Sequence, residues 1–147
     1  MIKNKNLITI LRQGKDFELI ENLEFWFEKG LREELKKALG NYALNARGLK
    51  GDYVCIPKGF KTDFGSIPQI FQSLISPVGK PTKSYVLHDY LLSLWDKGMI
   101  DRKTCDRVFK EALKIQGIGV FKRNVMFLCV RAYSIFKEIS KKLNFKN

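Results

Sequence analysis

The sequence contains a single histidine, His88, among its 147 residues. One histidine excludes the zinc peptidases of the H-E-x-x-H type and argues against the HD-type phosphohydrolases, because both need several imidazole ligands. Cysteine is also scarce: three thiols, odd in number and without a C-x-x-C pair, stand far apart at Cys55, Cys105 and Cys129. They predict neither a disulfide framework nor a zinc site, and we interpret them as reduced, partly buried thiols.

Long apolar runs are missing as well. The longest, "VMFLCV" at residues 125–130, stops at Arg131 and is far too short to span a bilayer. The N-terminal stretch "MIKNKNLITILRQG" has no extended apolar region and no small-residue cleavage pattern, so no signal peptide is expected. The sequence therefore predicts a soluble or peripheral protein without a transmembrane segment.

Acidic residues are few. Twenty-seven Lys and Arg face fifteen Asp and Glu, which gives a formal net charge of +12. Residues 118–147 hold seven of the basic residues and one Glu. Such a field favours a polyanionic partner, namely nucleic acid, an anionic membrane or an acidic cell-wall polymer, although a purely solubilising surface would have the same composition.

The pattern of apolar residues predicts an α+β fold in one domain, residues 1–147: a small N-terminal antiparallel β-sheet packed on a C-terminal bundle of about three helices. Residues 1–66 are expected to be mainly β, with a hairpin within residues 7–27 whose turn lies near "RQGKD". A helical insertion is expected near residues 30–48, and Gly40 should cap the C-terminus of its helix. After residue 51, β-prone residues broken by Pro and Gly predict a strand that runs into a shaped loop.

Residues 67–147 are expected to be mainly α-helical. One helix covers about residues 83–96, and a second starts near Asp101 with one apolar face formed by Cys105, Val108, Phe109, Ala112 and Leu113. A third, about residues 121–142, carries an apolar stripe that should pack on another element: Phe121, Val125, Leu128, Ala132, Ile135 and Ile139. Its basic residues should stay exposed and form the polyanion-binding set: Lys122, Arg123, Arg131, Lys137, Lys141 and Lys142.

The stretch "SYVLHDYLLSLWDKG" places His88 and Asp89 in a helix that is apolar nearly all round. Both side chains should therefore be buried and need polar partners. Helices that end near Asp96 and begin near Asp101 form a tight antiparallel hairpin, so His88 and Asp106 lie at similar heights and can meet across the ~8–10 Å between the two axes. A carboxylate that orients an imidazole leaves its other nitrogen free to take a proton from water, which suits ester hydrolysis. A purely structural histidine remains the alternative.

Three segments, "IPKGFKTDFGSIP", "SYVLHDYLLSL" and "CDRVFKEAL", resemble the signature blocks of a domain-of-unknown-function family found in tailed phages and prophages. The resemblance covers about residues 50–135. It implies a phage or prophage protein, located in the host cytoplasm or in the virion, with a phage or host protein as a further candidate partner. Within the first block and beside His88, the expected supporting residues are Gly59, Phe60, Thr62, Ser66 and Tyr90.

The second and third blocks also resemble, more weakly, the paired helices of secreted phospholipase A2. That resemblance implies that His88 is a general base, that Asp106 is its orienting partner and that Asp89 binds calcium. The Gly-rich calcium loop and the disulfides of the phospholipases are absent, so Asp63 and main-chain carbonyls of "KGFKTDFGSIP" would have to supply the remaining ligands.

Other interpretations stay open. Asp63 and Ser66 stand in a Gly- and Pro-rich loop, where such residues commonly cap turns or helices. A triad of Ser66, His88 and Asp106 lacks the G-x-S-x-G context of serine hydrolases. The leading hypothesis is a His/Asp hydrolase acting on a lipid or cell-envelope ester. The alternatives are a non-enzymatic phage accessory or virion-assembly protein, and a basic protein that binds nucleic acid or a host factor.

Overall fold

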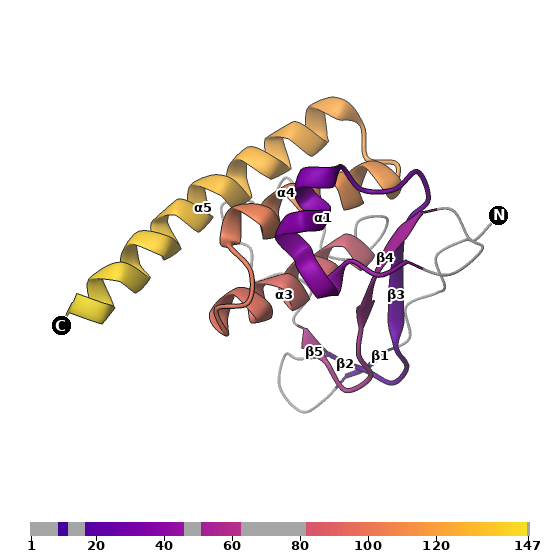
Figure 1. The fold of residues 1–147 in the computed structure, drawn as a ribbon, viewed down its shortest axis with the longest axis horizontal. Coiled ribbons are helices and arrows are strands. Elements are labelled where there is room, and N and C mark those ends of the chain that lie inside the picture. The colour runs from indigo at the N-terminus through magenta and orange to yellow at the C-terminus, as the bar shows by residue number, and fades with distance from the viewer. Residues whose placement is uncertain (1–8, 12–16, 46–50, 63–81, 147) are drawn as a thin grey trace.

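The computed structural model describes residues 9–11, 17–45, 51–62 and 82–146. All its strands precede residue 63, and three long helices follow residue 81. The strands lie on one side of the molecule and the three long helices on the other (Figure 1). The expected α+β class is confirmed.

The strands form two small antiparallel sheets, whereas the sequence analysis expected one. Strand β1 (Thr9–Leu11) pairs with β2 (Phe17–Leu19), and β2 also pairs with β5 (Lys61–Thr62). The second sheet joins β3 (Leu23–Phe27) to β4 (Asp52–Ile56). The predicted hairpin is present as β1 and β2, while its expected turn at residues 12–16 lies outside the described residues. The alternating burial of β4 places Asp52, Val54 and Ile56 on the core side.

The helical insertion is an excursion between two paired strands. Helix α1 (Glu33–Leu39) buries Leu35 and Leu39, and a short 3-10 helix (Gly40–Tyr42) follows it. Gly40 adopts a φ of 57° at the end of α1, as its predicted C-terminal position requires. The buried Asp52 carboxylate accepts a hydrogen bond of 2.7 Å from the Leu31 backbone N–H, which fixes the start of the excursion to the sheet. No sequence pattern pointed to this role of Asp52.

Helices α3 (Thr82–Asp96) and α4 (Arg102–Ile115) form the predicted antiparallel hairpin. All five residues of the predicted apolar face of α4 are buried. Asp101 precedes α4 as expected, but its carboxylate accepts a hydrogen bond from the Thr104 hydroxyl and caps no backbone N–H. The main core lies between α3, α4 and the β3–β4 sheet, with Phe25, Ile56, Leu87 and Leu91 fully buried.

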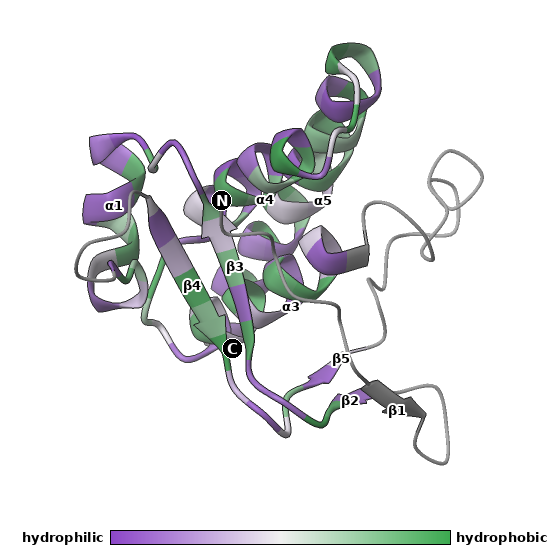
Figure 2. Ribbon diagram, turned by 90° about the vertical axis from the view of Figure 1, so that its right-hand side faces the viewer, coloured by the Kyte–Doolittle hydropathy of each residue, from purple (hydrophilic) through white to green (hydrophobic). Residues whose placement is uncertain are grey.

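Helix α5 (Val120–Lys146) crosses α4 and runs beyond the rest of the molecule to the C-terminus (Figure 1). Met126, Val130 and Ser134 face the body, while green and purple residues alternate along its length (Figure 2). The stripe that was expected to pack on another element is largely exposed instead, including Phe121 (84%) and Leu128 (65%), with Ile135 and Ile139. That expectation was wrong because α5 packs on α4 through other residues, which include Met126 and Ser134. No helix in the described ranges is long and apolar enough to cross a membrane.

Candidate functional site

The candidate site is centred on a contact between α3 and α4. His88 Nε2 lies 2.8 Å from Asp106 Oδ1. His88 is 8% exposed and Asp106 is fully buried. The short α3–α4 turn places the two side chains at the same height, so the contact that the hairpin geometry predicts is present. Its catalytic role stays a prediction.

A third residue completes this polar cluster. Arg131, on α5, donates a hydrogen bond of 2.9 Å from Nη1 to Asp106 Oδ2. Both carboxylate oxygens of Asp106 are therefore occupied, one by each neighbouring helix. Arg131 was expected to stay exposed, and this was wrong because its side chain turns inward and is only 18% exposed. Its part in polyanion binding stays a prediction. We call His88, Asp106 and Arg131 the polar triad.

The polar triad fixes the orientation of the imidazole. Since a carboxylate that already binds a guanidinium acts as an acceptor, Nε2 of His88 is the donor in this contact, and in the neutral ring the lone pair is then on Nδ1. The ring also stacks on Phe109, with centroids 4.7 Å apart and planes at 27°. Nδ1 has no hydrogen-bond partner in the described part of the chain. The side chain of His88 is 10% exposed, so part of the ring reaches solvent.

Two hydroxyls near the triad, Ser84 Oγ and Tyr85 Oη, are fully buried and have no hydrogen-bond partner in the described chain. Ser84 lies one helical turn before His88, on the same face of α3. Tyr85 packs on Phe109 with ring centroids 5.7 Å apart, and burial raises the pKa of its hydroxyl. Sequence analysis singled out neither residue, because hydroxyl residues within an apolar helix carry no distinctive spacing.

Most of the expected supporting residues gather where β5 meets α3. The Thr62 hydroxyl donates a 2.6 Å hydrogen bond to Asp89 Oδ2, and the rings of Phe60 and Tyr90 meet edge to face at 5.5 Å. Gly59, with a φ of 88°, forms the turn before β5. Asp63 and Ser66 lie outside the described residues. Thr62 is the last described residue before this gap.

The described residues around Asp89 do not by themselves supply a calcium site. Calcium takes six to eight oxygen ligands, whereas no group of three or more His, Cys, Asp or Glu side chains within the described segments could hold a metal ion. Asp89 also accepts the hydrogen bond from Thr62. Calcium binding therefore stays a prediction.

The six expected polyanion-binding residues do not form one exposed face. Besides Arg131, Arg123 turns to the Ile118 carbonyl oxygen at 3.2 Å, and the ammonium groups of Lys137 and Lys141 lie over the rings of Tyr133 and Trp95. Lys122, Lys137 and Lys142 are exposed, whereas Arg123, Arg131 and Lys141 are partly buried.

Comparison with known proteins gives one match. No curated protein and no solved structure matches the chain significantly. A family model described as "Protein of unknown function (DUF1353)" matches residues 41–130, which include β4, β5, α3, α4 and the first part of α5. This match covers more than half of the sequence and includes His88, Asp89 and Asp106. The chain belongs to this family of proteins of unknown function.

Proposed function

We propose that this protein is a His/Asp-dependent hydrolase of a lipid or cell-envelope ester. The observation that carries the proposal is the 2.8 Å contact of His88 Nε2 with Asp106, which leaves Nδ1 unpartnered within the described chain, on a side chain that is 10% exposed. A neutral imidazole held in this way is a general base with a defined direction. The resemblance of the two helices to those of secreted phospholipase A2 supports the choice of an ester.

The reaction would use one water molecule. Nδ1 of His88 removes a proton from water while the water oxygen attacks the ester carbonyl carbon. Asp106 stabilises the imidazolium that forms, and the imidazolium then protonates the departing alkoxide as the carbon–oxygen bond breaks. His88 is the catalytic base, whereas Asp106 and Arg131 are positioning residues.

We also propose a phage or prophage origin, with the host cytoplasm or the virion as the location. The support is the resemblance of the segments around Gly59, His88 and Asp106 to blocks found in phage and prophage proteins. The basic residues of α5 support an anionic membrane, a cell-wall polymer or a nucleic acid as partner, since the chain carries a net charge of +12.

A second function is favoured by a different observation. Asp106 is fully buried and both its oxygens are bonded, so the polar triad also serves to join α3, α4 and α5. In a non-enzymatic accessory or virion-assembly protein, this cluster would hold the helices in register and have no substrate.

One substitution separates the two functions. His88→Gln keeps a polar side chain that can bond to Asp106 but removes the base, so a hydrolase should lose about 100- to 10,000-fold in rate while staying folded. Lys97→Gln, at the exposed position directly after the end of α3, is the matched control. Wild type and both variants would be assayed on phospholipid vesicles and cell-wall esters, with calcium and with chelator, and their thermal melts recorded.

The two outcomes differ clearly. Loss of hydrolysis in His88→Gln, with the melting temperature and the control unchanged, supports the enzyme. Wild-type protein that is inert on every ester, together with a His88→Gln variant that melts at a lower temperature, refutes the hydrolase and supports the assembly role.

A further inference from the structure

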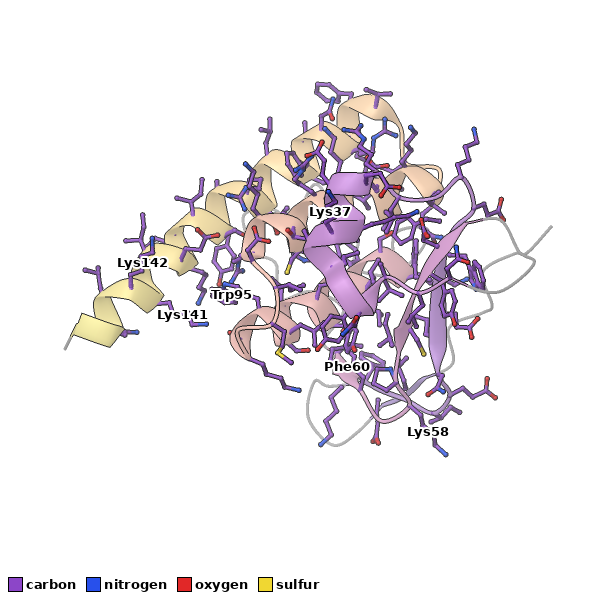
Figure 3. All side chains as sticks on the ribbon, viewed as in Figure 1. Lys37, Lys58, Phe60, Trp95, Lys141 and Lys142 are labelled. Carbon is purple, nitrogen blue, oxygen red and sulfur yellow. The ribbon has the colours of Figure 1, made fainter. Side chains whose placement is uncertain are left out.

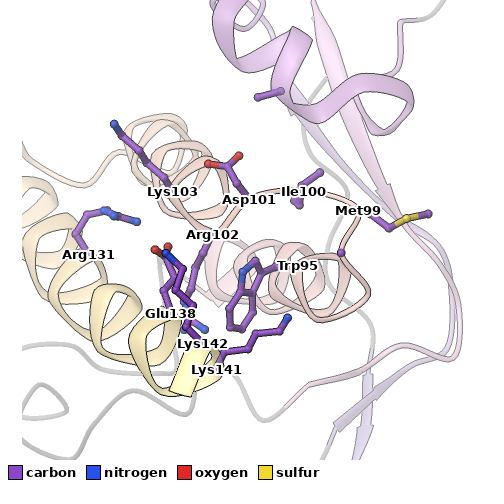
Figure 4. Close-up of a pocket in the computed structure, with 12 residues that line it drawn as sticks. Trp95, Met99, Ile100, Asp101, Arg102, Lys103, Arg131, Glu138, Lys141 and Lys142 are labelled. Carbon is purple, nitrogen blue, oxygen red and sulfur yellow. The ribbon is translucent and has the colours of Figure 1, made fainter. Parts of the chain in front are cut away.

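A second candidate site lies in a hollow between the α3–α4 turn and the C-terminal half of α5, and Arg131 of the polar triad is part of its lining. It has a volume of about 800 Å³. Trp95 and the first residues of α4 line one side, and Lys141 and Lys142 of α5 line the other (Figure 4). Trp95, Lys141 and Lys142 also lie close together in the view of all side chains (Figure 3).

Arg102, which lines the hollow, is a buried cation that makes no ion pair within the described ranges. It is 5% exposed, and no carboxylate of the described chain pairs with it. Its guanidinium carbon lies 4.5 Å from the centre of the Trp95 ring. A buried charge that is not paired with a carboxylate is costly, so an anion beside Arg102 would be favourable.

The hydrogen bonds of Arg102 leave its outer end available. Nε donates to Ser134 Oγ at 2.7 Å, and this is the guanidinium's one hydrogen bond within the described ranges. Its two terminal nitrogens have no hydrogen-bond partner there. A guanidinium fixed at Nε, with two terminal nitrogens unpartnered, has the geometry that binds two oxygens of a phosphate or carboxylate together.

The charges around the hollow favour a dianion. Its lining holds five cationic residues, Arg102, Lys103, Arg131, Lys141 and Lys142, and two acidic ones, Asp101 and Glu138. Asp106 offsets Arg131, which leaves a surplus of two positive charges. A phosphate monoester carries nearly two negative charges near neutral pH, whereas a carboxylate carries one.

The start of α4 adds to this preference. Asp101 and Arg102 stand at the N-terminus of a 14-residue helix, where backbone N–H groups and the helix dipole favour an anion. Asp101 bonds to the Thr104 hydroxyl and leaves these N–H groups without a side-chain cap.

We propose that this hollow binds a phosphate monoester, with Arg102 holding two phosphate oxygens and Lys103, Lys141 and Lys142 supplying the surrounding charge. The proposal goes beyond the hydrolase function and does not depend on it. The same phosphate chemistry occurs in free metabolites and in the headgroup of phosphatidic acid, so the test must include both sources.

The test measures binding to the intact chain at low salt. Calorimetry with inorganic phosphate and with glycerol phosphate covers the free ligands, and sedimentation with phosphatidylcholine vesicles, with and without phosphatidic acid, covers the lipid. Arg102→Lys keeps the charge but loses the two-pronged geometry, so affinity should fall about tenfold or more. Lys142→Gln, at an exposed position where folding is not at risk, should weaken binding about two- to tenfold.

Lys97→Gln is the matched control, because it removes one positive charge from the same end of α3 without touching the hollow. Binding of either phosphate source that depends on Arg102 and Lys142, but not on Lys97, supports the proposal and identifies the source. Absence of binding to all probes overturns it. Equal weakening of binding by Lys97→Gln and Lys142→Gln would also overturn it. So would tighter binding to a DNA duplex, used as a further probe, that Arg102→Lys leaves unchanged. Either result would show that the net positive charge of the protein, and not the hollow, attracts the anion.

Discussion

Replacing Arg131 by Met removes the charge that balances a fully buried carboxylate. Asp106 has no exposed surface, and its partners are Arg131 at 2.9 Å and His88 at 2.8 Å. Met has similar length and helix propensity, so the change tests the ion pair and leaves α5 otherwise intact. The side chain of Arg131 is 18% exposed, and solvent therefore weakens part of its interaction with Asp106.

The expected loss follows from these contacts. Breaking a buried ion pair costs about 3–5 kcal/mol, and the partial exposure of Arg131 together with the remaining His88 contact lowers this to about 2–3 kcal/mol. For a chain of this length the melting temperature should fall by about 4–12 °C. Urea denaturation and thermal melts followed by circular dichroism would measure both quantities.

Lys122→Met is the matched control, since it removes the same charge from an exposed position near the start of the same helix. It should change the free energy of unfolding by less than about 0.5 kcal/mol. If the two variants lose the same stability, the Arg131–Asp106 pair contributes nothing specific, and the triad does not hold α5 to the body.

Two further predictions concern other parts of the fold. Gly51→Ala should destabilise the protein by about 2 kcal/mol or more, since Gly51 has a φ of 110° and a Cβ there would lie 2.6 Å from the Phe27 carbonyl oxygen. Gly119→Ala is the control, because a Cβ at Gly119 has no neighbour within 4 Å. Urea denaturation of both variants would measure the difference. Tyr85→Phe should raise stability by about 1 kcal/mol at neutral pH, because it removes a buried hydroxyl that has no partner in the described chain. Burial raises the pKa of Tyr85 in the folded state. The wild type should therefore also lose stability as the pH rises above the ordinary tyrosine pKa of 10.0, and Tyr85→Phe should lose less stability over the same pH range. Equal losses in both proteins would contradict this.

The sequence predicted those parts of the site that depend on short-range geometry. The His88–Asp106 contact follows from a tight turn between two helices, and the buried face of α4 follows from regular spacing. Arg131 could not be placed in the same way, because nothing local distinguishes an arginine that turns inward from its exposed neighbours. Its role depends on how α5 crosses α4, which is a long-range property of the fold.

Two other departures have the same origin. The spacing of Phe121, Leu128 and Ile135 correctly identified an apolar face of α5, but α5 packs through Met126 on its other side. Likewise, alternation identified strands without showing that β3 pairs with β4, and β2 with β5, in separate sheets. Periodicity shows which residues share a face, whereas the partner of that face is decided by the whole chain.

The position of Arg131 in the chain has a consequence for biosynthesis. Because the ribosome makes the protein from the N-terminus, Asp106 emerges 25 residues before the guanidinium that balances it. Until Arg131 is made, His88 is the partner of the Asp106 carboxylate within the α3–α4 hairpin. If the two helices pack at this stage, they bury the negative charge of Asp106 without the positive charge of Arg131. Docking of α5 is thus the step that completes the hairpin, and a nascent chain that stops short of Arg131 should remain open to proteases at its α3–α4 interface.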